Sequence, residues 1–141
     1  MSKVSLYCPT LVEVSQLPTT NTKIQDVVEA VSLFRTYAEK FHKSHQDVIL
    51  VMHLNRENQL LGMEVVPLHV YRRLRASEIF SGAILRNVSV ITVCRYCSSH
   101  LSVPSKSDQR IALRLRKAGE ILGIELRDFI IVTKNRYFSL M

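Results

Sequence analysis

Residues 88–108 read VSVITVCRYCSSHLSVPSKSD and contain three elements in a row. The β-branched run Val88–Val93 is typical of an interior strand. A loop with two cysteines and one histidine follows it. Pro104 and Ser105 then begin a helix, and Asp108 in its first turn forms a capping box with Ser105, with Asp in place of Glu. A strand end, a loop of soft ligands and a helix N-terminus with a carboxylate predict a functional site here, and together they could hold a divalent cation.

Helical periodicity is clearest from Ser105 to Leu122, where Gly123 is a natural C-terminal stop. The same periodicity over 23–42 predicts an amphipathic helix with one buried face. Ser77 is expected to cap a third helix over 78–86, which stops at Asn87. The remaining patterns predict a buried strand over 47–54, a second strand over 59–66 antiparallel to it, strands over 124–132 and 137–140, and an edge strand or extended arm over 4–14.

The order β-α-β-β-α-β-α-β-β predicts a mixed central sheet with helices packed on its faces, an α/β or α+β sandwich. A chain of 141 residues is long enough to bury a sizeable core. We therefore expect a single globular unit over 23–141, preceded by an N-terminal strand or arm over 1–22.

The composition is that of an ordered globular chain, with 47% hydrophobic residues and only 4 Gly and 4 Pro. No apolar run approaches the roughly 20 residues that span a bilayer, and the N-terminus has no signal-peptide pattern. Three cysteines fit a reducing compartment better than a disulfide framework. We therefore expect a cytoplasmic protein with no membrane partner.

The formal net charge of +7 permits binding to nucleic acid or another anionic surface. Basic residues gather in two groups, and the spacing of the second aligns it on one helical face. The groups are Arg72, Arg73 and Arg75, and Lys106, Arg110, Arg114 and Lys117. Phosphate contacts from these residues would be salt-dependent and independent of base sequence. A solvated polar face with no ligand is the alternative interpretation.

Several short motifs follow one another in the chain and resemble one known family. They are Leu54-Asn55-Arg56-x-Asn58, Ser77-Glu78-Ile79-Phe80 with Ala83, Pro104-Ser105-x-x-Asp108, Leu115-x-x-Ala118-Gly119-x-x-Leu122-Gly123-Ile124, Asp128-Phe129-Ile130-Ile131 and Tyr137-Phe138-Ser139. This set resembles the RadC-like branch of the JAB/MPN (JAMM) metalloprotease-fold family, over roughly two thirds of the chain. The resemblance implies a JAB/MPN-like, cytidine-deaminase-like sandwich.

The resemblance also implies where a metal site would lie. In the family, a His-x-His-Pro-Ser-Gly loop precedes Pro-Ser-x-x-Asp, and the two His and the Asp bind zinc. Counting back from Pro104, the two His positions fall on Arg95 and Cys97, whereas Asp108 matches the ligand Asp. Arg95 has no lone pair to offer a metal, so the motif is degenerate.

Two further family positions bear on catalysis. The Ser of the family loop matches Ser99. The glutamate that acts as general base before the first core strand falls near Gln46, with Asp47 one residue on. Because a glutamine side chain cannot take a proton from a metal-bound water, the general base is expected to be lost.

Two functions therefore stay open. In the first, the chain is a catalytically inactive, pseudoenzyme member that binds a protein or nucleic acid without a cofactor; RadC-like proteins also carry an association with DNA repair. In the second, it is a zinc-dependent metallopeptidase or isopeptidase-type hydrolase with a remodelled site. Candidate ligands for that zinc are Cys94, Cys97, His100 and Asp108, and Cys94-x-x-Cys97 has ligand spacing.

The same residues have alternative interpretations. Cys94 could simply belong to the core, and the Cys94-x-x-Cys97 pair could be a redox dithiol. Asp108 is also explained by capping alone, without metal. The position of Arg95 discriminates between the two functions. An ion pair with Asp108 favours the inactive protein, whereas convergence of Cys97, His100 and Asp108 favours the hydrolase.

Overall fold

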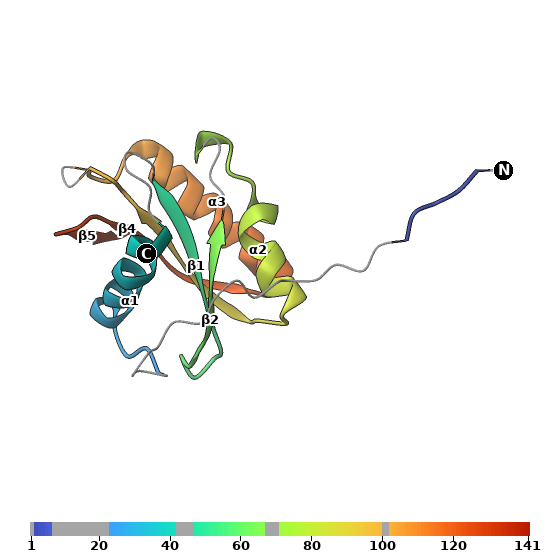
Figure 1. Ribbon diagram of the computed structural model, residues 1–141, viewed down its shortest axis with the longest axis horizontal. Coiled ribbons are helices and arrows are strands. Elements are labelled where there is room, and N and C mark those ends of the chain that lie inside the picture. Colours follow the sequence, from blue (N-terminus) through green and yellow to red (C-terminus); the bar gives the residue numbers. More distant parts are fainter. Residues whose placement is uncertain (1, 7–22, 42–46, 67–70, 100–101) are drawn as a thin grey trace.

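The computed structural model describes residues 2–6, 23–41, 47–66, 71–99 and 102–141. In these residues a mixed five-stranded sheet is flanked by three helices (Figure 1). One helix covers one face of the sheet and two cover the other. The predicted mixed α/β sandwich is therefore confirmed.

The sheet has the strand order β2-β1-β3-β4-β5. The strands are β1 (Val48–Leu54), β2 (Leu60–Val66), β3 (Val90–Tyr96), β4 (Glu125–Val132) and β5 (Tyr137–Ser139). β1 is antiparallel to both β2 and β3, β3 is parallel to β4, and β5 is antiparallel to β4. All seven residues of β1 are buried, as its uniformly apolar sequence predicts for a strand covered on both faces.

Helix α1 (Val27–Phe41) covers one face of the sheet, where Phe34 packs with Leu50 and Cys94. Helices α2 (Ala76–Leu85) and α3 (Lys106–Leu122) cover the other, where Phe80 and Leu115 pack with residues that include Val51, Val93 and Phe129. Successive side chains of a strand point to opposite faces, so β3 contributes to both cores. A short 3-10 helix, η1 (Tyr71–Arg73), precedes α2.

The first helix begins later than the periodicity predicts. It starts at Val27, and Asp26 Oδ1 accepts a hydrogen bond from Glu29 N at 2.9 Å, which makes Asp26 its cap. Lys23 instead forms an isolated β-bridge with Gln59, just before β2. The apolar pattern continues through Ile24 because that side chain is buried as well, although Lys23 and Gln25 beside it are exposed.

Helix α2 begins at Ala76 with Arg75 as its N-cap, so the prediction that Ser77 caps it is wrong. Glu78 explains the earlier start, because its Oε2 accepts a hydrogen bond from Arg75 N at 3.4 Å. Asn87 follows the helix with φ 56°, as expected of a stop residue in the left-handed region.

Strand β3 extends to Tyr96, three residues beyond the predicted end at Val93. Strand pairing with β1 and β4 continues through these residues and holds them in the sheet. The helix after the loop agrees with its prediction. Ser105 is the N-cap of α3, Asp108 completes the capping box, and Gly123 ends the helix in the left-handed region at φ 74°.

The predicted N-terminal strand or arm over 4–14 falls mostly outside the described residues. The part that is described, residues 2–6, forms neither helix nor strand, and Val4 and Leu6 are almost fully exposed. No helix in the described part of the chain combines the length and the hydropathy that a bilayer crossing requires.

Candidate functional site

Three parts of the fold meet at the carboxyl end of β3. The antiparallel pairing of Val48 with Tyr96 sets the start of β1 beside the end of β3. The first turn of α3 and the helix η1 also contribute side chains there. Four residues distant in sequence are thereby brought together, namely Asp47, Tyr71, Arg95 and Asp108.

Arg95 lies at the centre of this cluster. Its Nη1 donates to Asp108 Oδ1 at 2.9 Å, and its Nη2 and Nε donate to Asp47 Oδ2 at 2.8 and 3.1 Å. The guanidinium therefore bridges two carboxylates, and its side chain is 21% exposed. Burial alone would lower the pKa of Arg95, but Cys97, Asp108 and Asp47 raise it overall. Arg95 thus stays a cation held between two anions.

Asp108 has no free acceptor position. Its Oδ1 accepts from the Tyr71 hydroxyl at 2.5 Å as well as from Arg95. Its Oδ2 accepts from Ser105 N at 2.7 Å and from Ser105 Oγ at 3.0 Å. The side chain is fully buried. Burial disfavours its charged form, but the bonds from Tyr71 and Ser105 and the charge of Arg95 hold the pKa of Asp108 below its usual value. These four bonds match the lone-pair capacity of a carboxylate.

Tyr71 covers the cluster from η1. Its hydroxyl donates to Asp108, and the Arg95 guanidinium carbon lies 4.3 Å from the centroid of its ring, at cation–π distance. Burial and the hydrogen bond to Asp108 both raise the pKa of Tyr71. Tyr71 therefore remains a neutral donor that stabilises the carboxylate.

Asp47 holds the other side of Arg95 and also fixes the loop. Its Oδ1 accepts from Ser98 N at 3.1 Å, while its Oδ2 accepts from Arg95. Ser99 follows in the same loop and is exposed. The general-base position at Gln46 lies outside the described residues, as does His100.

Cys97 and Cys94 lie in different cores. Cys97 packs with the residues of the α2–α3 face, and Cys94 packs with those of the α1 face. Burial raises the pKa of the Cys97 thiol to about 11, although Arg95 opposes the shift, and burial also raises the pKa of Cys94. The two sulfur atoms therefore face opposite sides of the sheet, and both groups favour the thiol over the thiolate.

These residues do not fit a zinc ion. Arg95 has no lone pair, and both oxygens of Asp108 are occupied by donors. Zinc binds thiolates, neutral imidazoles and carboxylates, usually three or four of them. Within the described ranges, no group of three such residues is arranged to hold a metal.

Sequence reasoning did not assign Asp47 or Tyr71 to the site. Asp47 follows the predicted general-base position by one residue, and that proximity was a usable signal. Tyr71 lies 37 positions before its partner Asp108 in a segment without clear periodicity. No pattern in the sequence connects the two residues.

The predicted phosphate-binding residues form one surface. Lys106, Arg110, Arg114 and Lys117 are exposed along α3, and Arg73 and Arg75 are exposed beside it. Arg114 donates through Nη2 to the backbone oxygen of Leu74, which joins the two groups. The side chain of Arg72 lies outside the described part.

The fold and the site together define a mixed α/β sandwich of JAB/MPN type, with a carboxylate in the first turn of α3 beside the end of β3. The chain belongs to the RadC-like JAB domain family, whose model matches residues 24–141.

Curated relatives support this assignment. A UPF0758 protein of Clostridium botulinum (strain Alaska E43 / Type E3) is 35% identical over 97 residues, which cover 67% of this chain and 42% of the relative. A UPF0758 protein of Carboxydothermus hydrogenoformans is 35% identical over 101 residues, covering 70% and 44%. For one of Clostridium beijerinckii the values are 33% over 103 residues, 72% and 45%. This chain thus spans less than half the length of the relatives that it matches.

Proposed function

We propose that this chain is a catalytically inactive RadC-like JAB domain that works as a binding module for another macromolecule. The observation that carries the proposal is the Arg95 guanidinium, which bridges Asp47 and Asp108 at a position where the family resemblance puts a metal ligand. A fixed cation side chain there repels a divalent metal ion and consumes the ligand oxygens that the metal would use.

The charges of the cluster support the same conclusion. Two carboxylates facing each other without a cation would repel, and Asp108 is fully buried. The Arg95 guanidinium and the Tyr71 hydroxyl supply the charge and the hydrogen bonds that a metal ion would otherwise provide. The site is therefore electrostatically satisfied by the chain itself.

Hydrolysis of the family type needs an acidified water and a group that takes its proton. Asp108 accepts four hydrogen bonds and its pKa is lowered, so it is a poor proton acceptor. A hydrolase built on Cys97, Asp108 and His100 would need a free Asp108 oxygen as a zinc ligand, and both oxygens already accept hydrogen bonds. The described residues favour the binding module over the remodelled zinc hydrolase.

The test is the metal content of the purified, untagged chain after zinc soaking, measured by plasma mass spectrometry. The wild type and Asp108→Ala are both expected to show no zinc above background. A gain-of-function variant makes this result informative. Arg95→His/Cys97→His supplies the two family histidines beside Asp108 and is expected to hold about one zinc per chain. Arg95→Gln/Cys97→Ser is the matched control and is expected to hold none.

One result would overturn the proposal. If the wild type binds about one zinc per chain and Asp108→Ala does not, then Arg95 leaves the site and a hydrolase becomes the better interpretation. A double-histidine variant that folds but stays free of metal would instead show that the resemblance misplaces the ligand positions. The unfolding transition of each variant separates both results from simple misfolding.

A further inference from the structure

We propose that the exposed surface of α3 and η1 binds the sugar–phosphate backbone of a double-helical nucleic acid. The proposal rests on the binding function proposed above and names its partner and surface. Three observations support duplex binding: the distribution of charge over the two helical layers, the contacts that join two basic segments, and the kinds of side chain on that surface.

The charge of the chain is concentrated on one face of the sheet. The segments that cover the α2–α3 face, 71–86 and 105–123, contain nine Lys and Arg against three Asp and Glu. The segment that covers the α1 face, 23–41, contains three of each. A formal net charge of +7 is therefore mostly a property of one face, which gives that face a positive field.

Two contacts merge the basic segments into one surface. The Tyr71 hydroxyl donates to Asp108, which fastens η1 to the first turn of α3. Two turns further along α3, Arg114 donates to the backbone oxygen of Leu74. Arg73 and Arg75 are consequently held beside the basic row of α3, although more than thirty positions separate the two segments in the sequence.

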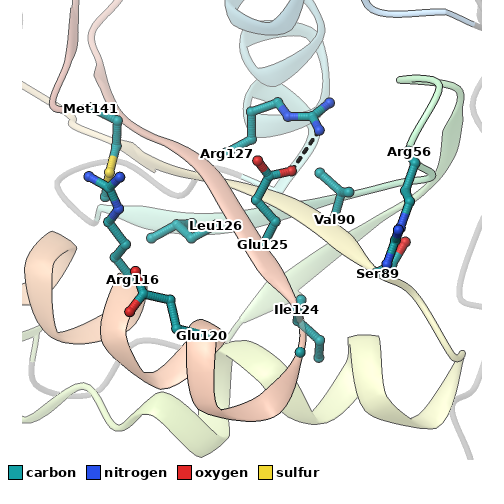
Figure 2. Close-up of a pocket in the computed structure, with 12 residues that line it drawn as sticks. Arg56, Ser89, Val90, Arg116, Glu120, Ile124, Glu125, Leu126, Arg127 and Met141 are labelled. Atoms are coloured by element: carbon teal, nitrogen blue, oxygen red, sulfur yellow. Dashed lines mark hydrogen bonds and ion pairs between the residues drawn. The ribbon is translucent and has the colours of Figure 1, made fainter.

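The acidic residues of these segments do little to neutralise the surface. Asp108 is buried and paired with Arg95, whereas Glu78 pairs with Arg75 at 3.2 Å and offsets that one surface cation. Glu120 is the third and lies beyond Lys117, toward the end of α3 (Figure 2). From Lys106 to Lys117 the row rises about 16 Å along the helix axis, long enough to face several successive phosphates of one strand.

The side chains on the surface favour a duplex over other polyanions. Proteins that bind single strands use exposed aromatic platforms, whereas here Phe80 is buried and the ring of Tyr71 is covered by Arg95. Lysine is depleted at the centres of protein interfaces, but Lys106 and Lys117 lie on this row. Two apolar residues, Leu113 and Ile121, are 54% and 87% exposed on the same helix. They are the side chains that a protein partner would bury, so a variant without them tests that alternative.

The experiment measures fluorescence anisotropy of labelled, random-sequence duplex DNA and duplex RNA with the full chain, between about 50 and about 200 mM salt. Arg110→Gln/Lys117→Gln removes two cations of the row. The matched control is Lys23→Gln/Lys40→Gln, which lowers the net charge of +7 by the same two units from the α1 face. A third variant, Leu113→Ser/Ile121→Ser, removes the exposed apolar side chains.

The wild type and the α1-face control are expected to bind a duplex with affinity that falls steeply with salt. Arg110→Gln/Lys117→Gln is expected to bind at least about tenfold more weakly, with a log–log salt slope flatter by about 1.8. Leu113→Ser/Ile121→Ser should bind like the wild type. The DNA and RNA arms identify which duplex is preferred.

Three results would overturn the inference: no duplex binding at the lowest salt, equal losses in the two charge variants, or tighter binding of a single strand, polyglutamate or anionic vesicles than of the duplex. The metal assay shows whether such a result counts only against duplex binding or also against the proposed inactive domain. A chain that binds no duplex and no zinc keeps the inactive-domain proposal, whereas a chain that binds zinc loses it whatever its affinity for nucleic acid.

Discussion

Two polar clusters lie at opposite ends of the paired strands β1 and β3, and both face the α2–α3 side of the sheet. One surrounds Arg95, and the other surrounds His53, which is 1% exposed. Both combine an arginine with a carboxylate. They differ in the elements that supply their residues. The Arg95 cluster is built largely from residues of loops and helix starts, whereas the His53 cluster is built largely from residues of strands and a helix.

His53 is held from both sides. Its Nε2 lies 3.1 Å from Glu64 Oε2 on the neighbouring strand β2, and its Nδ1 lies 2.9 Å from Arg86 Nη1 at the end of α2. A guanidinium can only donate, so Nδ1 is the acceptor, and the N–H at Nε2 donates a hydrogen bond to Glu64 Oε2. Arg86 also donates to the backbone oxygen of Leu61 at 2.9 Å. The cluster thus ties two strands and a helix together.

Two glycines leave the space that this cluster needs. A Cβ at Gly82 would lie 2.2 Å from Glu64 Oε2, and a Cβ at Gly62 would lie 2.3 Å from Arg86 Nη1. The glycines therefore leave room for these side-chain ends, and neither has a positive φ. They mark the His53 cluster as part of the scaffold.

The two clusters combine the same kinds of side chain, an arginine and a carboxylate, but we interpret their roles differently. The His53 cluster crosslinks regular elements, so we interpret it as structural. In the Arg95 cluster, Asp47 lies just before β1 and Asp108 lies at the start of a helix. Because these two carboxylates lie at element ends and not within paired strands, the Arg95 cluster is where we place the proposed loss of the metal site. The following predictions test this distinction, beginning with the largest expected effect.

Asp108→Ala should be the most destabilising single change. It removes the buried partner of Arg95, the acceptor for the Tyr71 hydroxyl and the acceptor for Ser105 N. Breaking a buried ion pair by removing one partner costs up to about 3–5 kcal/mol. Asp47 still pairs with Arg95 in this variant, but the Tyr71 hydroxyl and Ser105 N lose their acceptor. Urea denaturation measures the loss as a lower midpoint with an unchanged slope.

Asp47→Ala is the matched control for that change. It removes the other carboxylate of Arg95, but this side chain is 24% exposed, so water can replace part of the interaction. The expected loss in free energy of unfolding is at most about 1 kcal/mol. Equal losses for the two variants would show that burial does not distinguish the two carboxylates.

His53→Leu should destabilise the chain by about 1–3 kcal/mol, because a buried side chain loses two hydrogen bonds. The loss is smaller than for Asp108→Ala because Glu64 and Arg86 both reach solvent and can be hydrated. Gly82→Ala should also weaken the cluster, since its Cβ takes the place of Glu64 Oε2. Neither variant should change binding to nucleic acid. A change in that binding with the fold intact would contradict the purely structural interpretation.

Much of this architecture could be predicted from local patterns. Apolar periodicity gave the elements around the site, and the Ser105-x-x-Asp108 motif fixed the start of α3. Family spacing assigned Arg95 to a ligand position. The partners of Arg95 could not be derived in the same way, because Asp47 is 48 positions away and the two meet only through the pairing of β1 with β3.

Element ends were harder to predict because tertiary contacts move them. Strand pairing extends β3 to Tyr96, and the bridge between Lys23 and Gln59 keeps residues before Asp26 out of α1. Tyr71 was missed for a related reason. A single short 3-10 turn has no periodicity, so only the fold reveals that its hydroxyl meets Asp108.

Tyr71→Phe tests the cluster through its pH dependence. At neutral pH the variant loses one hydrogen bond to a carboxylate, at a cost of about 1.5–3 kcal/mol. In the wild type, burial and that bond raise the pKa of Tyr71 above its ordinary value of about 10. Above about pH 10 the unfolded chain therefore holds fewer protons at this residue than the folded chain, and wild-type stability falls as pH rises.

The measurement is the difference in free energy of unfolding between the wild type and Tyr71→Phe. It should shrink by up to about 1.4 kcal/mol for each pH unit above about 10. The other tyrosines titrate in both proteins and cancel in the difference. A difference that stays constant through this range would mean that Tyr71 ionises alike in the folded and unfolded chains.

The smallest effects come from the two serines at helix starts. Ser105 Oγ accepts from Asp108 N at 3.1 Å and donates to Asp108 Oδ2, so Ser105→Ala should cost about 1 kcal/mol. Ser77 is exposed inside α2, where alanine is a better helix former, so Ser77→Ala should change stability by only a few tenths of a kcal/mol. Urea denaturation of both variants compares two serines that the sequence alone assigns the same role. A larger loss at Ser77 would mean that α2 is capped where its sequence suggests, and that the bond from Arg75 N to Glu78 does not determine its start.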